Sequence, residues 1–150
     1  MNLKDKINED LKTAMKEKDA VKLQTIRSIR ALILEFEKSG TDKELTPEDE
    51  IKMLSQAAKK RQESIEQFRN AGRNELADKE EAELKIIQVY LPKQLTIEEI
   101  EAEVKRIAAD VGAVSKADFA KVMPVAAKEM KGKADGKTIK TIVEKVLGNN

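Results

Sequence analysis

Hydrophobic residues recur along the first part of the chain with the spacing of amphipathic helices. Leu3, Ile7, Leu11 and Met15 follow one another at intervals of four residues. This spacing predicts a helix, because residues three or four apart share a helix face whereas a strand alternates from residue to residue. A second run follows Asp19, a residue type that caps helix N-termini. Its apolar positions are Val21, Ile26, Ile29, Ile33 and Phe36.

Two more helices are predicted before residue 92. Gly40 and the polar stretch to Leu45 end the second helix, and Thr46-Pro47-Glu48-Asp49 opens the third. Thr is a capping residue, Pro suits the first helical position, and acidic residues are favoured in the first turn. The third helix runs to Gly72 through Ile51, Leu54, Ala58, Ile65 and Phe68. A fourth run, with Leu76, Leu84, Ile87 and Leu91, ends at Pro92 because proline disfavours a helical conformation in the residue before it.

Three shorter helices are predicted in the remaining residues. Thr96 and Glu99 have the spacing of a capping box, and Gly112 is placed to end the helix that they begin. Ser115 opens the next helix, in which Pro124 is expected to produce a kink or a split. A turn at residues 132–136 precedes the last helix, which ends before Gly148. The apolar positions of these helices are Ile100, Val104, Ile107, Val111, Phe119, Val122, Met123, Ile139, Ile142, Val143, Val146 and Leu147.

These patterns predict an all-α protein with two parts. An N-terminal four-helix domain is expected over residues 1–92 and a smaller three-helix C-terminal domain over residues 93–150. The composition agrees, since aromatic residues make up only 3% of the 150 residues and charged residues 38%, which suits helix packing better than a sheet. The chain has no Cys and no His, which excludes thiol nucleophiles, disulfides, and imidazole bases or metal ligands. No catalytic residues, metal site or cofactor are therefore expected.

The same survey predicts a cytoplasmic protein without membrane contact. The first residues lack the apolar stretch of a signal peptide. The longest apolar run, Ala31 to Leu34, is far shorter than the roughly 20 residues that a membrane-spanning helix requires.

Positive charge is concentrated in the last third of the chain. Residues 112–150 hold 8 Lys against 4 acidic residues, a net charge of +4, whereas residues 1–92 have a net charge of −1. Within this third, a turn and a helix start fall between Lys128 and Lys140. Helix N-termini and nearby lysines favour anions, and glycine lets a phosphate approach the backbone. The predicted RNA-contacting residues are Lys128, Lys131, Gly132, Lys133, Asp135, Gly136, Lys137 and Lys140.

A structural interpretation of the same residues stays open. Gly132 can end one helix and Asp135 can cap the next, while the lysines are simply solvated. Other basic residues, at 27, 30, 59–61, 69 and 73, are interpreted as solvated helix faces. The acidic clusters at residues 80–83 and 98–101 are explained by helix starts and exposed faces. Tyr90 is expected to pack at the junction of the two halves, and the few aromatic residues leave little for base stacking.

Three segments resemble the GatB/YqeY family, and the free-standing YqeY-like proteins in particular. They are Phe68 to Leu76, Tyr90 to Glu99, and Lys131 to Lys137, in the family's order along the chain. The resemblance implies a helical N-terminal domain and a three-helix C-terminal domain. It also implies a likeness to the tail of the B subunit of the glutamine-dependent tRNA amidotransferase, a tail that helps to hold tRNA while other parts carry out the chemistry. A carbon–nitrogen ligase activity with glutamine as amide donor is implied only through this family association.

Three functions follow as hypotheses. The first is a tRNA-binding accessory protein without its own active site, with tRNA and amidotransferase or synthetase components as partners. The second is a protein-interaction or assembly module with no RNA role, in which apolar helix stripes bind a partner helix. The third, a self-sufficient enzyme, is disfavoured because the chain offers no nucleophile and base set.

Overall fold

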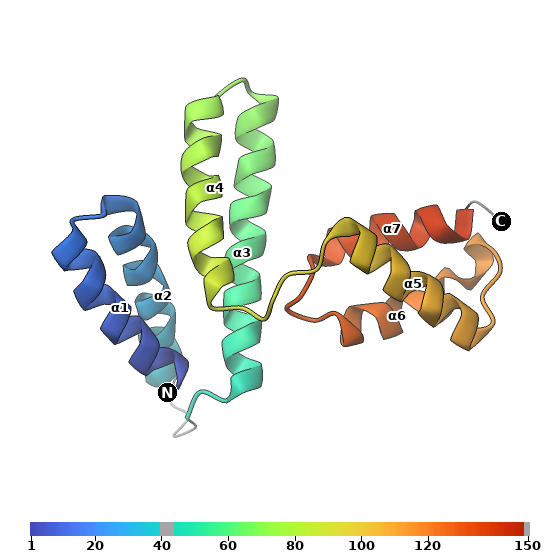
Figure 1. Ribbon diagram of the computed structural model, residues 1–150, viewed down its shortest axis with the longest axis horizontal. Coiled ribbons are helices and arrows are strands. Elements are labelled where there is room, and N and C mark those ends of the chain that lie inside the picture. The colour runs from blue at the N-terminus through green and yellow to red at the C-terminus, as the bar shows by residue number, and fades with distance from the viewer. Residues whose placement is uncertain (40–43, 149–150) are drawn as a thin grey trace. The chain divides into compact units, whose positions relative to one another are not determined.

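The computed structural model describes residues 1–39 and 44–148, and all regular structure within these ranges is helical (Figure 1). This confirms the all-α class for the described residues. Gly40, where the second helix was predicted to end, lies outside them. The helices are α1 (Leu3–Glu17), α2 (Ala20–Lys38), α3 (Pro47–Asn70), α4 (Asn74–Val89), α5 (Ile97–Val111), α6 (Phe119–Glu129) and α7 (Gly136–Gly148), with a 3-10 turn η1 (Lys116–Asp118) before α6.

The predicted helix caps are confirmed. The Asp19 carboxylate accepts a hydrogen bond from the Lys22 backbone N–H at 3.1 Å. Thr46 forms a capping box with Asp49 at the start of α3, where Pro47 is the first helical residue. Thr96 does the same with Glu99 at the start of α5. Each cap satisfies backbone N–H groups that the helix itself leaves without partners.

The buried face of α1 differs from the predicted one. Leu3 and Ile7 are buried, but Met15 is 54% exposed and Ala14 is buried in its place. A strict interval of four residues turns about 40° too far at each step of a helix with 3.6 residues per turn. By the third step Met15 has therefore left the face that Leu3 begins.

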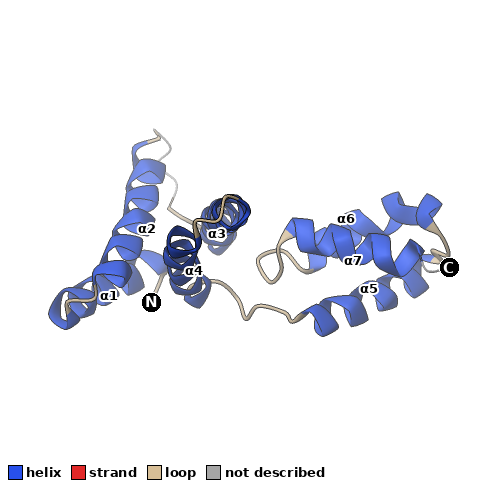
Figure 2. Ribbon diagram, turned by 90° about the horizontal axis from the view of Figure 1, so that it is seen from above, coloured by secondary structure: helices blue, strands red, loops and turns tan. Residues whose placement is uncertain are grey.

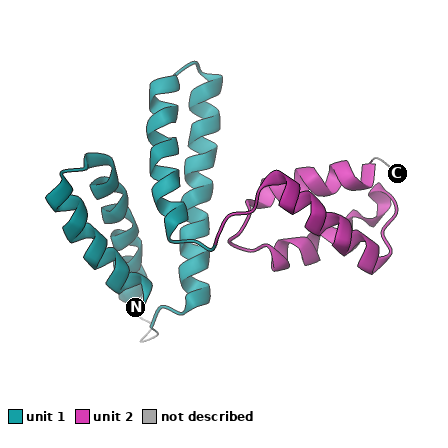
Figure 3. Ribbon diagram, viewed as in Figure 1, with its two compact units in different colours: residues 1–92 teal, residues 93–150 magenta. Residues whose placement is uncertain are grey.

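The helices group into two compact units, Met1–Pro92 and Lys93–Asn150 (Figure 3). In unit 1, α1 pairs with α2 and α3 pairs with α4, and the two pairs meet through α2 and α4. Figures 1 and 2 show the long α3–α4 hairpin and the shorter α1–α2 hairpin. Fully buried side chains of unit 1 include Ile7, Ile26, Ile29, Leu54 and Ile87.

Tyr90 belongs to the packing of unit 1. Its ring packs against the core of that unit, and its hydroxyl donates a hydrogen bond to the Asp10 carboxylate on α1. Burial, followed by this bond, raises the pKa of Tyr90. Tyr90 was expected to pack at the junction of the two halves. It instead links the end of α4 to α1 within unit 1.

Unit 2 packs α5, α6 and α7 around their own core, which includes Val104, Ile107, Val122, Ile139, Val143 and Leu147. Gly112 ends α5 as predicted, with a φ of 70°. The segment after Ser115 begins as the 3-10 turn η1, so α6 itself starts only at Phe119. Pro124 lies inside α6 and does not split it. None of the described helices combines the length and apolar character needed to cross a membrane.

Candidate functional site

The lysine-rich segment forms the connection between α6 and α7. Met130 ends α6, and its carbonyl accepts hydrogen bonds from the backbone N–H groups of Lys133 at 2.9 Å and Ala134 at 3.2 Å. Gly132 has a φ of 78°, in the left-handed region that glycine adopts without the strain that a side chain brings. The Met130 side chain is buried in the core of unit 2 and anchors the turn there.

Two residues before α5 hold this turn from the other side. The Gln94 side-chain amide donates to the Gly132 carbonyl at 2.7 Å, and the Leu95 backbone N–H donates to the Lys133 carbonyl at 2.9 Å. Gly132 is buried and its carbonyl is engaged by Gln94, so it contributes to the shape of the turn. Local sequence reasoning missed this tie, because it joins segments 38 residues apart.

Asp135 occupies the start of α7. Its carbonyl accepts the Ile139 N–H at 3.0 Å, and its carboxylate accepts the Thr138 hydroxyl at 3.5 Å. Asp135 therefore stands directly before the first residue of α7, where the sequence left a capping role open. The carboxylate places a negative charge at the helix N-terminus, where the helix dipole favours it.

The lysines of the turn project into solvent. Lys128, Lys131, Lys133, Lys137 and Lys140 are all exposed. Among the described residues, no ion pair involves the ammonium groups at 128, 131, 133 and 140. Three other lysines of unit 2 form ion pairs, Lys105 with Glu101 at 3.3 Å, Lys121 with Asp118 at 3.4 Å and Lys145 with Glu101 at 3.8 Å. The structure therefore groups four unpaired cations on and beside one fixed turn.

Elsewhere, charged side chains compensate one another. Arg69 forms ion pairs with Asp78 at 3.0 Å and Glu81 at 2.8 Å. On the α5 surface, Arg106 contacts three acids, at positions 103, 110 and 129. The acidic cluster at the start of α5 is engaged too, since Glu99 closes the capping box and its pKa is lowered by the hydrogen bonds to Thr96. Within the described ranges, no group of three or more carboxylates is arranged to hold a metal ion.

One buried carboxylate stands out in unit 1. Glu83 is 7% exposed and lies 3.9 Å from Nε of Arg61, whose terminal nitrogen donates to the Ser28 hydroxyl at 3.3 Å. Burial, followed by the neighbouring Glu80, raises the pKa of Glu83, while Arg61 opposes this rise. Nε of Arg61 is itself buried without a hydrogen-bond acceptor.

A groove of about 480 Å³ separates α2 from α3 in unit 1. Its walls carry residues three or four apart on both helices, and Leu32, Phe36 and Met53 supply apolar surface. The remaining lining residues are Ser28, Glu35, Ser39, Asp49, Lys52, Gln56, Ala57, Lys60 and Arg61.

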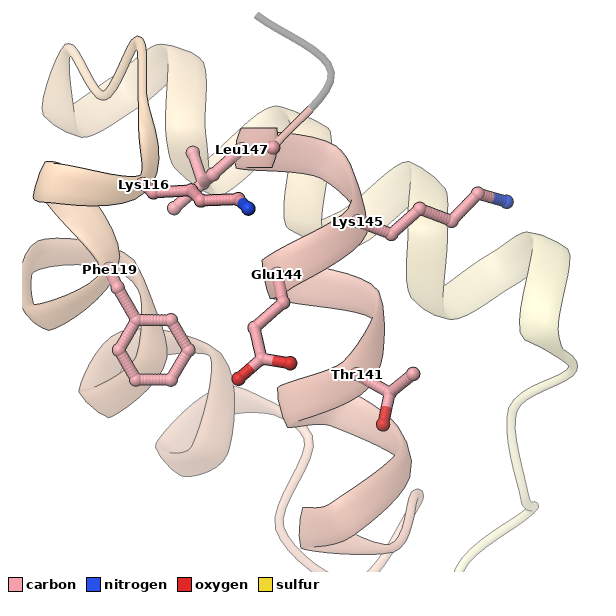
Figure 4. A pocket seen from close by; sticks show the side chains of 7 residues that line it. Lys116, Phe119, Thr141, Glu144, Lys145 and Leu147 are labelled. Carbon is pink, nitrogen blue, oxygen red and sulfur yellow. The ribbon is translucent and has the colours of Figure 1, made fainter.

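A second concavity, of about 630 Å³, lies at the end of α7 in unit 2 (Figure 4). It was not predicted, although its aromatic wall is Phe119, the only aromatic residue after Tyr90 in the sequence. The sequence placed Phe119 on an apolar helix face. The structure shows that it packs against the core and lines the pocket as well.

The chain is similar to a family of known proteins over nearly its whole length. The family model described as Yqey-like protein matches residues 4–147. The mitochondrial protein Altered inheritance of mitochondria protein 41 of Pyrenophora tritici-repentis is 32% identical over 146 residues, which cover 95% of this chain and 80% of the relative. Its namesakes in Eremothecium gossypii and Candida glabrata are 39% and 36% identical over 57% and 63% of this chain. The matched part spans about half the length of those two relatives.

These comparisons contradict the cytoplasmic location predicted from the sequence, because all three relatives are named as mitochondrial proteins. The prediction rested on a missing apolar leader. That criterion tests only for secretion, since mitochondrial transit peptides are amphipathic and rich in Arg and Ser.

Proposed function

Because the chain belongs to the YqeY-like protein family, we propose that it is a tRNA-binding accessory protein. In this proposal the connection between α6 and α7 with its flanking lysines, residues 128–140, contacts the RNA backbone, and we call this segment the lysine turn. The observation that carries this proposal is a group of exposed lysines on and beside a turn that is fixed on two sides. Lys128, Lys131, Lys133 and Lys140 form no ion pair among the residues that the structure describes. A fixed turn presents its ammonium groups with little loss of backbone freedom on binding, which favours affinity.

Recognition by lysines alone has a definite signature. Lysine contacts to phosphates release counterions from the RNA and carry no sequence information. Four such contacts give a slope of about −3 to −4 in a plot of log affinity against log salt. Binding is then expected to weaken about a hundredfold between 50 and 200 mM salt and to vary little among tRNA species.

The accessory role follows from the family resemblance to an amidotransferase tail. In this proposal the chain holds tRNA, while amidotransferase or synthetase components carry out amide transfer from glutamine. Unit 1 would serve as a four-helix domain and unit 2 as a three-helix domain that carries the RNA contact. Each unit has its own buried core, which supports this division.

Labelled tRNA should be titrated with the full chain across a salt series. The test variant changes Lys128, Lys131, Lys133 and Lys140 to Ala, and a matched control removes four exposed lysines of unit 1, at positions 12, 16, 59 and 79. Both variants lose the same net charge. The proposal expects the turn variant alone to lose most of the affinity and of the salt slope. Absence of binding at 50 mM salt, or equal losses in both variants, would refute it.

The groove between α2 and α3 favours a second candidate function, binding of an amphipathic helix from a partner protein. Its lining spans about three helical turns on each wall, the length over which a helix presents three or four apolar anchors. The exposed Lys52 and Lys60 on its α3 wall favour a partner helix with an acidic flank.

The salt dependence of binding distinguishes helix binding in the groove from RNA binding at the lysine turn. Calorimetry with purified amidotransferase components in 0.05 and 0.5 M salt should show persistent binding if the apolar groove is used. A Phe36→Ser, Met53→Ser variant should then bind weakly, while the lysine-turn variant binds normally. Binding that vanishes in 0.5 M salt and ignores the groove variant would exclude this function.

A further inference from the structure

We propose that the pocket at the end of α7 binds one unpaired nucleotide of RNA, with the base against the ring of Phe119 and the phosphate near Lys116 (Figure 4). This inference rests on the proposed RNA-binding function and adds a second, base-contacting site to it. The pocket measures about 630 Å³, which falls within the range of small-molecule sites, roughly 300–1,000 Å³.

Two elements that are distant in sequence build the pocket. Thr141, Glu144, Lys145 and Gly148 lie on one face of α7, at the three- and four-residue spacing that a helix requires. The opposite wall comes from η1 and the start of α6.

Phe119 provides a fixed stacking surface. It is half-buried, because part of it packs against the core of unit 2 while the rest lines the pocket. Its position is therefore set by packing and not by the ligand. Any base can stack on an aromatic face, so this contact adds affinity for unpaired nucleotides of every kind.

The stem of Lys116 approaches the end of α7 closely. A Cβ atom at position 148 would lie 2.8 Å from Cε of Lys116, so the lysine stem occupies space that only Gly148 leaves open. The end of a helix also attracts a positive charge, which helps to keep this side chain there. Within the described part of the chain the Lys116 ammonium forms no ion pair, so its charge is available to a phosphate.

The acidic side of the pocket sets the orientation of the nucleotide. Glu144 projects from α7 on the side of Phe119, as Figure 4 shows. A carboxylate repels phosphate and accepts hydrogen bonds from the exocyclic amino groups of adenine, cytosine and guanine. The phosphate is thereby directed to Lys116 and the base to Glu144. Lys145 extends away from the labelled side chains and pairs with Glu101, so it contributes only to the rim.

Mononucleotide titrations of the isotope-labelled full chain, followed by NMR, test the site. AMP is expected to shift the amide signals of Phe119, Thr141 and Glu144, and to bind about fivefold or more tightly than ribose 5-phosphate because of stacking. Purine riboside 5′-monophosphate should bind more weakly than AMP, since it has the same purine ring but no exocyclic amino group for Glu144. Equal affinity for AMP and ribose 5-phosphate, or shifts confined to other surfaces, would overturn the proposal.

Variants separate stacking, charge and folding. Phe119→Leu keeps apolar packing and should abolish the advantage of AMP over ribose 5-phosphate. Glu144→Ala alters an exposed side chain, which keeps the test independent of core packing, and should abolish the preference for AMP over purine riboside 5′-monophosphate. Gly148→Ala should displace Lys116 and weaken all phosphate-bearing ligands. Unchanged AMP binding by both Phe119→Leu and Glu144→Ala would refute the site.

The lysine-turn variant distinguishes this inference from the proposed function. If that variant loses tRNA while Phe119→Leu binds tRNA and AMP normally, the lysine turn stands and the nucleotide pocket fails. If AMP binds through Phe119 while the turn variant keeps full tRNA affinity, the pocket stands and the turn fails. If neither tRNA nor AMP binds, both fail.

Discussion

Arg61 and Glu83 form the most buried ion pair among the described residues of unit 1. The free energy of burying either charge therefore depends on the presence of the other. Taking a carboxylate out of water disfavours its charged form, and a nearby guanidinium only partly compensates. Since its folded-state pKa is raised, Glu83 contributes most to stability below its unfolded pKa. That contribution is lost as the pH rises through the folded value.

Arg61→Ala should therefore destabilise unit 1 more at pH 7 than at pH 4. Without Arg61, the ionised Glu83 is left buried with no cation beside it, which costs about 1–3 kcal/mol or more at neutral pH. At pH 4 the carboxyl group is protonated, and only the bond to Ser28 and some packing are lost. Urea unfolding at both pH values measures the difference, with the exposed Lys59→Ala as control. The same loss at both pH values would show that Glu83 does not depend on Arg61.

At the scale of single helices, the caps are the features that link sequence to structure most directly. The α5 capping box depends on the charge of Glu99, whose pKa is lowered by its bonds to Thr96. A lowered folded-state pKa stabilises the helix above the unfolded pKa, and this stabilisation is lost as the pH falls through the folded value. Glu99→Gln keeps an acceptor oxygen but removes the titration.

The helicity of α5 should therefore lose part of its acid sensitivity in Glu99→Gln. Acid titration of unit 2 amides by NMR, from pH 6 to pH 2.5, measures this. Thr96→Ala serves as the comparison, because it removes the cap at every pH and should cost about 1 kcal/mol. An unchanged acid profile in Glu99→Gln would mean that Glu99 does not control the pH dependence of this helix.

The order of the helices and their caps could be predicted from local sequence, but contacts between helices could not. Asp19, Thr46 and Thr96 were identified as caps because a cap acts on residues two or three positions away. The bond from Gln94 to Gly132 joins distant segments, and the pocket at Phe119 depends on how α6 meets α7. No local pattern specifies either one. The candidate lysines were identifiable, whereas the tie that fixes them was not.

That tie gives a prediction of its own. Gln94→Ala removes the side-chain bond to the Gly132 carbonyl and should cost about 1 kcal/mol. If the lysine turn binds RNA, the loosened turn should also bind tRNA more weakly at constant net charge. The salt slope should remain, since all the lysines are still present. Unfolding curves and tRNA titrations measure the two effects, and Gln62→Ala, a half-buried glutamine of unit 1, is the control.

At the scale of the whole molecule, the candidate binding sites are divided between the two units. The lysine turn and the Phe119 pocket belong to unit 2, whereas the groove between α2 and α3 belongs to unit 1. Each unit has its own cluster of buried side chains. A chain organised in this way can keep RNA contact in one unit and partner binding in the other, provided that each unit is stable by itself.

Truncating one buried isoleucine in each core tests whether each unit is stable by itself. Ile87→Ala in α4 and Ile107→Ala in α5 each truncate a buried isoleucine, at 0% and 1% exposure, and each should cost about 2–5 kcal/mol. If the units fold as independent domains, each variant should lose hydrogen-exchange protection only in its own unit of the full chain. Residue-resolved exchange measures this directly. Equal loss of protection in both units from either substitution would mean that the chain unfolds as one cooperative body, and the division into two domains would have to be abandoned.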